Sequence, residues 1–340
     1  IYKINFAGGE PLLNKNVGEY IKFSKELGLK TSIISFASRM TNSWLMNYGR
    51  YLDQIGIIEG IADGERIWSA RFMGDRAYLV TFENIDPLWV LDLSDPVNPI
   101  ILGELEVPGV STYIHPVDEN TLLTIGIGPG DDGLGLDWSM TQISLFDVSD
   151  PTNPTLADSL PISPVYADDD CQNIRTCGWS WSWSEATYEH KAFTYWAPEN
   201  MLAVPLSTYR YVYDENYYDG GYEHISMLKL IDVDTENLSL SEHGEIDHSS
   251  FYNDDDGPNW WFYSTSIRRS IFMGDYIYAF STLGVTIHNT TDLTHMQDML
   301  IPGSHYAEDV GEEESEQESN ESSGEDEPCP EGPEGDSCQD

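Results

Sequence analysis

The stretch FMGDRAY at residues 72–78 returns as FMGDYIY at residues 272–278. In both copies an apolar strand runs into Gly-Asp, which favours a tight hairpin turn, and a second strand follows. Another motif is also repeated: LDLSDPVNP at 91–99 returns as FDVSDPTNP at 146–154, and IDVD at 231–234 is a weaker copy. Its prolines cannot donate hydrogen bonds within a sheet, so this motif is predicted to be a loop that follows a strand.

These repeats predict four short strands per unit, with about 45–55 residues in each unit. The spacing is typical of a β-propeller, and it places four blades at about residues 65–108, 110–161, 183–247 and 264–300. A β-sandwich is the alternative, but it does not account for two repeated motifs. Four blades would form a small ring or an incomplete one, and an incomplete ring exposes strand edges that favour association.

The charge of the chain changes near residue 60. Residues 1–57 hold seven Lys and Arg against four acidic residues, a net charge of +3, whereas residues 58–340 carry −46. The pattern of elements changes at the same place, from alternating strand and helix to strands alone. We therefore predict three parts: an α/β fragment at 1–58, a mainly β, propeller-like part at 61–305 and a disordered acidic tail at 306–340.

Composition narrows the classes of function. The 340 residues are 40% hydrophobic, which is enough for a buried core. The strong negative charge argues against binding to nucleic acid or to an anionic membrane surface. We find no apolar stretch of about 18 residues that could span a membrane. The chain opens with Ile1 inside a strand pattern and without a secretory signal, so we expect it to be a fragment.

The first 58 residues predict the order βαβαβ, which implies parallel strands with right-handed crossovers. Apolar periodicity and β-branched runs give a strand at 2–7, a helix at 17–27, a strand at 31–36, a helix that begins at Thr41 or Asn42 and ends at Tyr48, and a strand at 52–58. On the first helix we expect Val17, Tyr20, Ile21, Ser24 and Leu27 to share one face, and Gly28 to end the helix.

The sequence KINFAGGEP at 3–11, with SIIS at 32–35 and NYGRYLD at 47–53, resembles the viperin branch of the radical S-adenosylmethionine enzymes. The resemblance implies that Gly8, Gly9, Glu10 and Pro11 line the site of the cofactor's methionine group, with Ser35 nearby. Two glycines allow close approach of the backbone, and one carboxylate neutralises an ammonium group.

Two differences from that family weaken the prediction of activity. The family has Asn-Gly after the serine, where this chain has Phe36-Ala37. The family also binds a [4Fe–4S] cluster through Cys-x3-Cys-x2-Cys upstream of the Gly-Gly-Glu-Pro turn, and no cysteine precedes Cys171 here. We therefore expect no functional cofactor in this chain; S-adenosylmethionine and the cluster follow from the resemblance of residues 1–57 alone.

A second resemblance covers nearly all of residues 61–305. The stretches at 65–82, 86–103, 109–120, 145–154 and 184–193 resemble secreted bacterial proteins that carry a C-terminal β-propeller domain. The resemblance implies a location outside the cytoplasm and supplies no catalytic residues. If the first 58 residues determined the location instead, the cytoplasm would be expected.

Two clusters in the third predicted blade are candidate sites. Trp179, Trp181 and Trp183 alternate with serines, which places them on one face of a strand, either packed between blades or exposed as a platform for a sugar. The segment that follows holds four polar side chains, of which a Glu–His pair could act in acid–base chemistry or could be structural: Glu185, Tyr188, Glu189 and His190.

The cysteines fall into two close pairs, Cys171 with Cys177 and Cys329 with Cys338, for which we predict disulfides rather than free thiols or zinc ligands. Three acidic loops are weak candidates for Ca2+ and are otherwise solvated surface. They are 130–133 with Asp137, 168–170 and 254–257.

The interpretation that accounts for most of these features is a non-catalytic, extracytoplasmic β-propeller that binds an unknown protein or carbohydrate and carries an inactive radical S-adenosylmethionine fragment. The alternative is a viperin-like iron–sulfur enzyme whose cluster-binding cysteines lie upstream of Ile1. The change from +3 to −46 also raises the hypothesis that two unrelated sequences were joined in assembly or gene calling.

Overall fold

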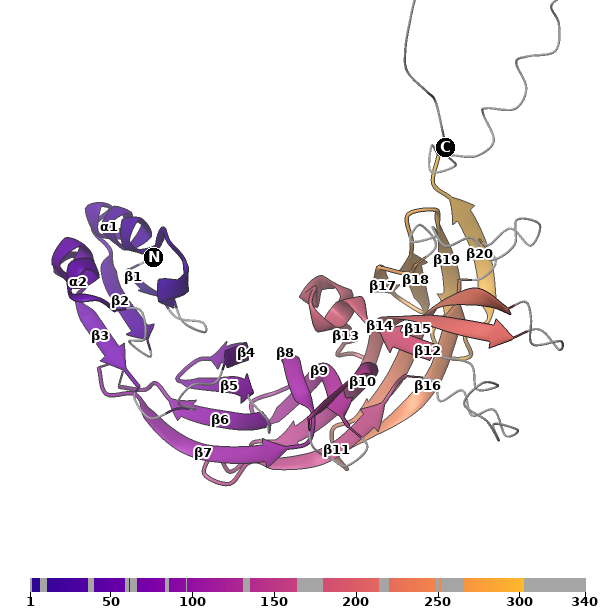
Figure 1. The fold of residues 1–340 in the computed structure, drawn as a ribbon, viewed down its shortest axis with the longest axis horizontal. Coiled ribbons are helices and arrows are strands. Elements are labelled where there is room, and N and C mark those ends of the chain that lie inside the picture. Colours follow the sequence, from indigo (N-terminus) through magenta and orange to yellow (C-terminus); the bar gives the residue numbers. More distant parts are fainter. Residues whose placement is uncertain are drawn as a thin grey trace, which may run out of the picture. The chain divides into compact units, whose positions relative to one another are not determined.

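The fold was obtained as a computed structural model, in which β-sheets dominate (Figure 1). The structure describes residues 2–6, 11–35, 40–58, 61, 66–82, 86–95, 97–130, 135–163, 180–213, 220–248, 251 and 266–302. Residues 1–301 form one compact unit, which contains all the described helices and strands. The predicted disulfide cysteines all lie outside the described residues, as do the acidic loops at 168–170 and 254–257 and residues 131–133 of the loop predicted at 130–133.

The N-terminal part has the predicted βαβαβ order. Strands β1 (Lys3–Phe6), β2 (Lys30–Ser35) and β3 (Gln54–Ile57) form a parallel sheet in which β2 is central and largely buried. A 3-10 helix, η1 (Pro11–Leu13), and helix α1 (Val17–Glu26) connect β1 to β2. Helix α2 (Asn42–Tyr48) and η2 (Gly49–Tyr51) connect β2 to β3.

Local sequence explains where these helices begin and end. The hydroxyl of Thr41 accepts a hydrogen bond from the Trp44 N–H at 3.1 Å and caps α2. Gly28 adopts a φ of +78°, a left-handed conformation that glycine tolerates best, directly after α1. The predicted apolar face of α1 was partly wrong. Val17, Ile21 and Ser24 are buried, but Tyr20 and Leu27 point to solvent because nothing in the described part of the chain covers that side.

Four antiparallel sheets follow, each with the four-stranded order of a propeller blade. Blade 1 contains β4 (Arg66–Met73), β5 (Arg76–Phe82), β6 (Asp86–Asp92) and β7 (Ile100–Val107). Blade 2 contains β8 (Val110–Pro116), β9 (Thr121–Pro129), β10 (Leu136–Asp147) and β11 (Thr155–Pro161).

Blade 3 contains β12 (Ser180–Trp183), β13 (Thr194–Trp196), β14 (Met201–Tyr213), β15 (Gly220–Asp234) and β16 (Ser239–Asp247). Blade 4 contains β17 (Arg269–Met273), β18 (Tyr276–Phe280), β19 (Gly284–Asn289) and β20 (His295–Leu300). These ranges confirm the four predicted blades and the mainly β fold class.

One backbone hydrogen bond recurs in all four blades. An N–H near the end of the third strand donates to a carbonyl in the turn between the first two strands. The donor–acceptor pairs are Leu93 to Asp75 (2.7 Å), Val148 to Asn120 (2.8 Å), Val233 to Asn200 (2.9 Å) and Thr290 to Asp275 (3.0 Å). The Gly-Asp turns seen in the sequence therefore do more than reverse the chain, because they also hold the third strand.

A β-bulge also recurs at one position of every outer strand. In each blade the partner strand skips one residue of the outer strand at the same register. The extra residues are Leu102, Ala157, His243 and Met296. Because both features recur, residues of different blades can be compared position by position.

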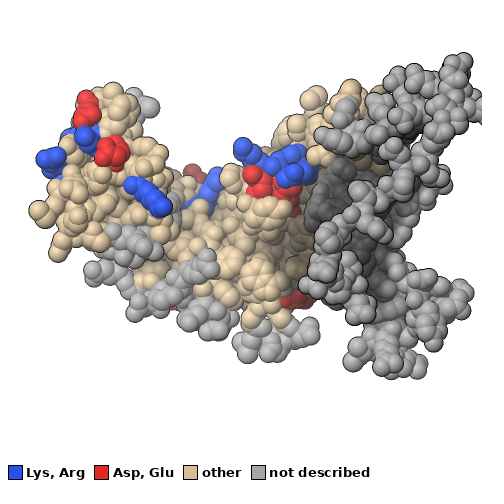
Figure 2. Space-filling view, turned by 45° about the horizontal axis from the view of Figure 1, so that its top comes forward, with Lys and Arg blue, Asp and Glu red and all other residues tan. Residues whose placement is uncertain are grey.

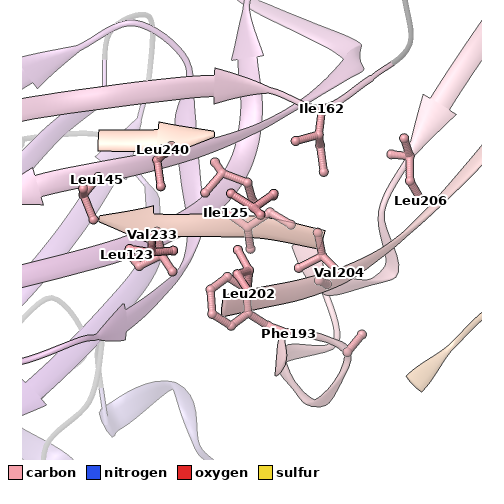
Figure 3. Close-up of a cluster of buried hydrophobic side chains, with 14 of the residues drawn as sticks. Leu123, Ile125, Leu145, Ile162, Phe193, Leu202, Val204, Leu206, Val233 and Leu240 are labelled. Carbon is pink, nitrogen blue, oxygen red and sulfur yellow. The ribbon is translucent and has the colours of Figure 1, made fainter. Parts of the chain in front are cut away.

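Neighbouring blades pack through apolar side chains. One buried cluster joins blades 1 and 2, another joins blades 2 and 3, and a third joins blades 3 and 4. Figure 3 shows the middle cluster, where Leu123, Ile125 and Leu145 of blade 2 meet side chains of blade 3 such as Leu202 and Val233. At the other side of blade 1, Ile34 and Ile58 of the N-terminal part pack against Leu79 and Leu91.

Candidate functional site

The inner position of blade 3 is unusual because two short strands share it. β13 pairs with Met201–Ala203 of β14, and β12 pairs with 207–210 of the same strand. Pro205 lies between the two pairings, where the absence of its N–H breaks no hydrogen bond on that edge. Residues 184–193 therefore leave the sheet, and they form the 3-10 helices η3 (Glu185–Thr187) and η4 (His190–Ala192).

Ser184 fixes the start of this segment. Its hydroxyl donates to the Pro205 carbonyl at 2.5 Å and accepts a hydrogen bond from the Ala186 N–H at 3.2 Å. From there the segment contacts the inner strands of both neighbouring blades, β8 and β17. The candidate acid–base residues are thus held where three blades meet.

Glu185 binds two arginines at the start of the inner strand of blade 4. Its carboxylate accepts hydrogen bonds from Arg268 Nε at 2.8 Å and from Arg269 Nη1 at 2.7 Å, and only 10% of its side chain is exposed. Burial by itself would raise the pKa of Glu185, but the hydrogen bonds and charges of the two arginines outweigh it and hold the pKa below its ordinary value. Glu185 therefore stays ionised and ties blade 3 to blade 4.

His190 belongs to a separate group of rings. It stacks on Tyr113 of blade 2 with ring centroids 5.8 Å apart and an angle of 17° between the planes. Phe193 packs against both Tyr113 and His115, at 5.1 and 5.5 Å. Among the described residues, we find no hydrogen bond between His190 and Glu185 or Glu189. The structure does not bring the suspected Glu–His pair together.

His115 is the most perturbed base of this group. Burial, with a smaller contribution from the positive charge of Arg71, lowers its pKa to about 4. The ring is therefore neutral at pH 7 and packs between Phe193 and Tyr195. Its role in the described structure is to join blades 2 and 3.

The tryptophan stripe shares one face, as the alternation predicted. Ser182, between the two described tryptophans, is only 3% exposed, whereas Trp181 exposes 47% of its surface. Trp183 stacks on Tyr209 of its own blade, with centroids 5.2 Å apart and planes 23° apart, and Tyr209 lies 4.7 Å from His224. Burial lowers the pKa of His224 to about 4, so this row of rings is uncharged at neutral pH. Trp179 lies outside the described residues.

In the view of Figure 2, most described side chains are uncharged, and some Lys and Arg lie next to Asp and Glu. The ion pairs of Glu185 with Arg268 and Arg269 are one such mixed group. Sequence reasoning missed the two arginines, although adjacent basic residues in a strongly acidic region were a usable signal.

The candidate cofactor residues of the N-terminal part are only partly described. Gly8, Gly9 and Glu10 lie outside the described residues, Pro11 begins η1, and Ser35 is buried at the end of β2. Residues 1–58 contain no cysteine, and the described residues hold no cluster of three His, Cys, Asp or Glu side chains that could bind a metal. An iron–sulfur cluster therefore lacks its thiolate ligands in this segment. Asp137 accepts hydrogen bonds from the backbone N–H and the hydroxyl of Ser139.

The sequence model of the beta propeller domain family matches residues 36–293, which include all but the end of the four blades. This chain belongs to the beta propeller domain family. An uncharacterized protein of Methanocaldococcus jannaschii is 32% identical over 246 residues, which cover 72% of this chain and 30% of that protein. Another, from Archaeoglobus fulgidus, is 35% identical over 169 residues, or 50% of this chain and 23% of that protein.

The beta propeller chain is also similar to a different protein over a short length. An S-adenosylmethionine-dependent nucleotide dehydratase of Lacinutrix mariniflava is 47% identical over 55 residues, covering 16% of this chain and 12% of the dehydratase. The chain thus spans less than a third of the length of each of these three relatives. No helix in the described ranges has both the length and the apolar character needed to span a membrane.

Proposed function

We propose that residues 66–301 form a non-catalytic binding scaffold that works outside the cytoplasm, with a carbohydrate or a protein as ligand. The observation that carries this proposal is the row of rings on blade 3. Trp183, Tyr209 and His224 stack along one face of the sheet, and Trp181 on the same strand exposes 47% of its surface. Flat, uncharged rings of this kind offer large contact area at low entropic cost.

The neighbouring residues support binding rather than catalysis. Glu185 is held by two arginines and His190 is stacked on Tyr113, so neither is placed to exchange a proton with the other. The net charge of −46 after residue 57 favours solubility and disfavours polyanionic ligands. An uncharged glycan fits both observations, because it can stack on the rings without catalysis and is not repelled by the negative charge.

Binding of the full chain to a panel of neutral oligosaccharides tests the proposal. We expect Trp181→Ala to weaken binding at least about tenfold, as expected for loss of an aromatic contact of about 1.5 kcal/mol. Trp138→Ala is the matched control, because Trp138 is 57% exposed on blade 2 and also contacts another ring. Equal loss in both variants would argue against a site on blade 3, and binding to proteins alone would select the second ligand class. Cell fractionation tests the location, because the full-length protein should be recovered outside the cytoplasm.

A second candidate function rests on the nucleotide dehydratase similarity of the first residues. It holds that the N-terminal part belongs to an S-adenosylmethionine enzyme whose cluster-binding cysteines lie upstream of Ile1. Sequencing of source DNA upstream of Ile1 tests for the cysteines. Sequencing across the codons for Tyr51 to Phe72 tests whether the N-terminal part and the blades are encoded together. A continuous reading frame with a cysteine triad would support it. A colourless longer protein without cofactor cleavage would end it.

A further inference from the structure

Each blade has one face toward the following blade, which we call its forward face. In blades 1, 2 and 3 this face is filled by apolar side chains that the next blade buries. In blade 1 the inner strands contribute Met73, Tyr78 and Leu88. Strand register shows the equivalent residues of blade 4: Met273, Tyr278 and Val285.

The outer strand shows the same correspondence. In blade 1 it contributes Leu102, Leu105 and Val107, and Leu102 is the bulged residue. In blade 4 the equivalent residues are Met296, Met299 and Ile301. Every compared position on the forward face of blade 4 thus carries an apolar or aromatic side chain, as in a blade that is covered.

Exposure separates the two faces except at Val285, which is 6% exposed. Val107 is 6% exposed and Tyr78 is fully buried, whereas Ile301, at the position of Val107, is 39% exposed. The three methionines of the blade 4 face, Met273, Met296 and Met299, are 60%, 52% and 43% exposed. An apolar face of this extent on the surface of a protein marks an interaction site.

The chain after blade 4 indicates what covers this face. Blade 1 leads into blade 2 through Val107-Pro108-Gly109, and Ile301-Pro302-Gly303 repeats that sequence at the end of blade 4. Gly109 has a φ of +89°, and an added Cβ would lie 2.6 Å from the Ile127 carbonyl, so this turn into a new blade requires glycine. The same two residues stand where a further blade would begin.

We propose that the forward face of blade 4 binds a further four-stranded propeller blade, which presents aliphatic side chains as blade 2 does with Leu122 and Val148. A second copy of this chain is a poorer occupant. In a head-to-tail contact the surface that it would offer is the back face of its blade 1, where Leu79 and Leu91 are covered by Ile34 and Ile58.

A duplicated blade tests the proposal. Residues 110–162, which form blade 2, are inserted between Gly303 and Ser304 of the full chain. The methionines then report on the interface, because hydrogen peroxide oxidises exposed methionine faster than buried methionine. We expect oxidation of Met273, Met296 and Met299 to slow at least about tenfold relative to the parent chain. Met201, which is 4% exposed in the parent chain, gives the rate for a buried methionine.

Met299→Asp in the extended chain is the matched control, and it should restore fast oxidation of Met273 and Met296. Circular dichroism and thermal unfolding establish that the inserted blade is folded. Unchanged methionine rates beside a folded insert would overturn the proposal. Sedimentation of the parent chain tests whether a second copy occupies the face. We expect a monomer over a wide concentration range. A dimer that Met299→Asp dissociates would assign the face to self-association instead.

Discussion

Blades 1 and 4 carry the same turn, the same bulge and the same apolar forward positions, yet their environments differ. Blade 1 is covered on both sides, by blade 2 and by Ile34 and Ile58. Blade 4 is covered by blade 3 on its back face, while Met273 and Met296 on its forward face are more than half exposed. The comparison shows that the repeat specifies a blade with two packing faces, whether or not a neighbour is present to use both.

The largest expected difference comes from placing a charge at one register in the two blades. Val107→Asp buries an unpaired carboxylate between blades 1 and 2, and we expect a loss of about 3 kcal/mol or more in the free energy of unfolding. Ile301→Asp puts the same group at an exposed site, and we expect a change within about 0.5 kcal/mol. Urea unfolding followed by circular dichroism measures both. Equal losses would mean that blade 4 is covered in solution.

The second-largest expected loss of stability concerns a contact of the inner strand in blades 1 and 4. In blade 1 the Ser69 hydroxyl donates to the Ser111 carbonyl of the following blade, whereas Arg269, at the equivalent register of blade 4, binds Glu185 of the preceding blade. Glu185→Ala leaves the two arginines without their carboxylate, and we expect a loss of about 2 kcal/mol. The matched control is Glu189→Ala, whose carboxylate lies 3.8 Å from Arg269, is 35% exposed and accepts a hydrogen bond from the Lys191 N–H, so its effect should stay below about 1 kcal/mol. Thermal unfolding measures both variants. A larger loss for Glu189→Ala would refute the assignment of Glu185 as the main partner of the two arginines.

The hairpin turns should respond alike in the two blades. Gly74 and Gly274 both have a φ of +59°, and neither has a neighbour within 4 Å of an added Cβ. Alanine therefore meets backbone strain without a clash, and we expect each substitution to cost about 1 kcal/mol. Chemical denaturation of Gly74→Ala and Gly274→Ala measures this. A cost confined to blade 1 would show that blade 4 is not folded as a full blade.

The smallest effect is a pH dependence specific to blade 4. His288 is buried on the back face, at the position held by Leu91 in blade 1. Burial lowers its pKa from 6.5; the Leu293 carbonyl opposes this shift, as does Asp298, while His295 adds to it. Because the folded pKa is depressed, the contribution of the neutral ring to stability is complete above pH 6.5 and is lost as pH falls below that value.

His288→Leu should remove this part of the pH dependence, an effect below about 1 kcal/mol because the Leu293 carbonyl and Asp298 oppose the effect of burial on the pKa of His288. Melting temperatures of the two proteins are compared at pH 7.5 and 5.5, and we expect the variant to lose less stability on acidification. Leu91→Ile in blade 1 is the control without a titrating group. The same pH response in wild type and in His288→Leu would contradict the assignment.

Much of the fold could be predicted from the sequence because the deciding signals are local. Gly-Asp after an apolar strand predicted the hairpins, and Thr41 and Gly28 predicted helix ends that the structure confirms. The fourth copy of the loop motif escaped notice because Asn289 stands where the first two copies have Asp92 and Asp147, and because Leu293 rather than proline follows Asp292. It is visible only once the hydrogen bonds of Asn289 and Asp292 to the N–H groups of Thr291 and Thr294 are seen.

The candidate site was less predictable, because it depends on contacts between residues far apart in the chain. Nothing local to Glu185 shows that its partners are Arg268 and Arg269, more than eighty residues later. The split inner strand of blade 3 was also missed. It depends on Pro205 facing a gap in the pairing, and a proline in a strand normally argues against a central position. The alternation of Trp181 and Trp183 did predict a shared face, but not which neighbours the rings would have.

The hydrogen bond from Leu93 to Asp75, and its three equivalents, has a consequence for how such a chain folds and diversifies. It closes a loop within a single blade, so a blade gains its first long-lived contact before any neighbour is present, and loop closure over so few residues is fast. A blade that contains its own closing hydrogen bond can be duplicated, deleted or recombined as a whole unit, because the contact that stabilises it lies within the duplicated sequence. That autonomy gives a physical basis for the repetition of the blade within this chain.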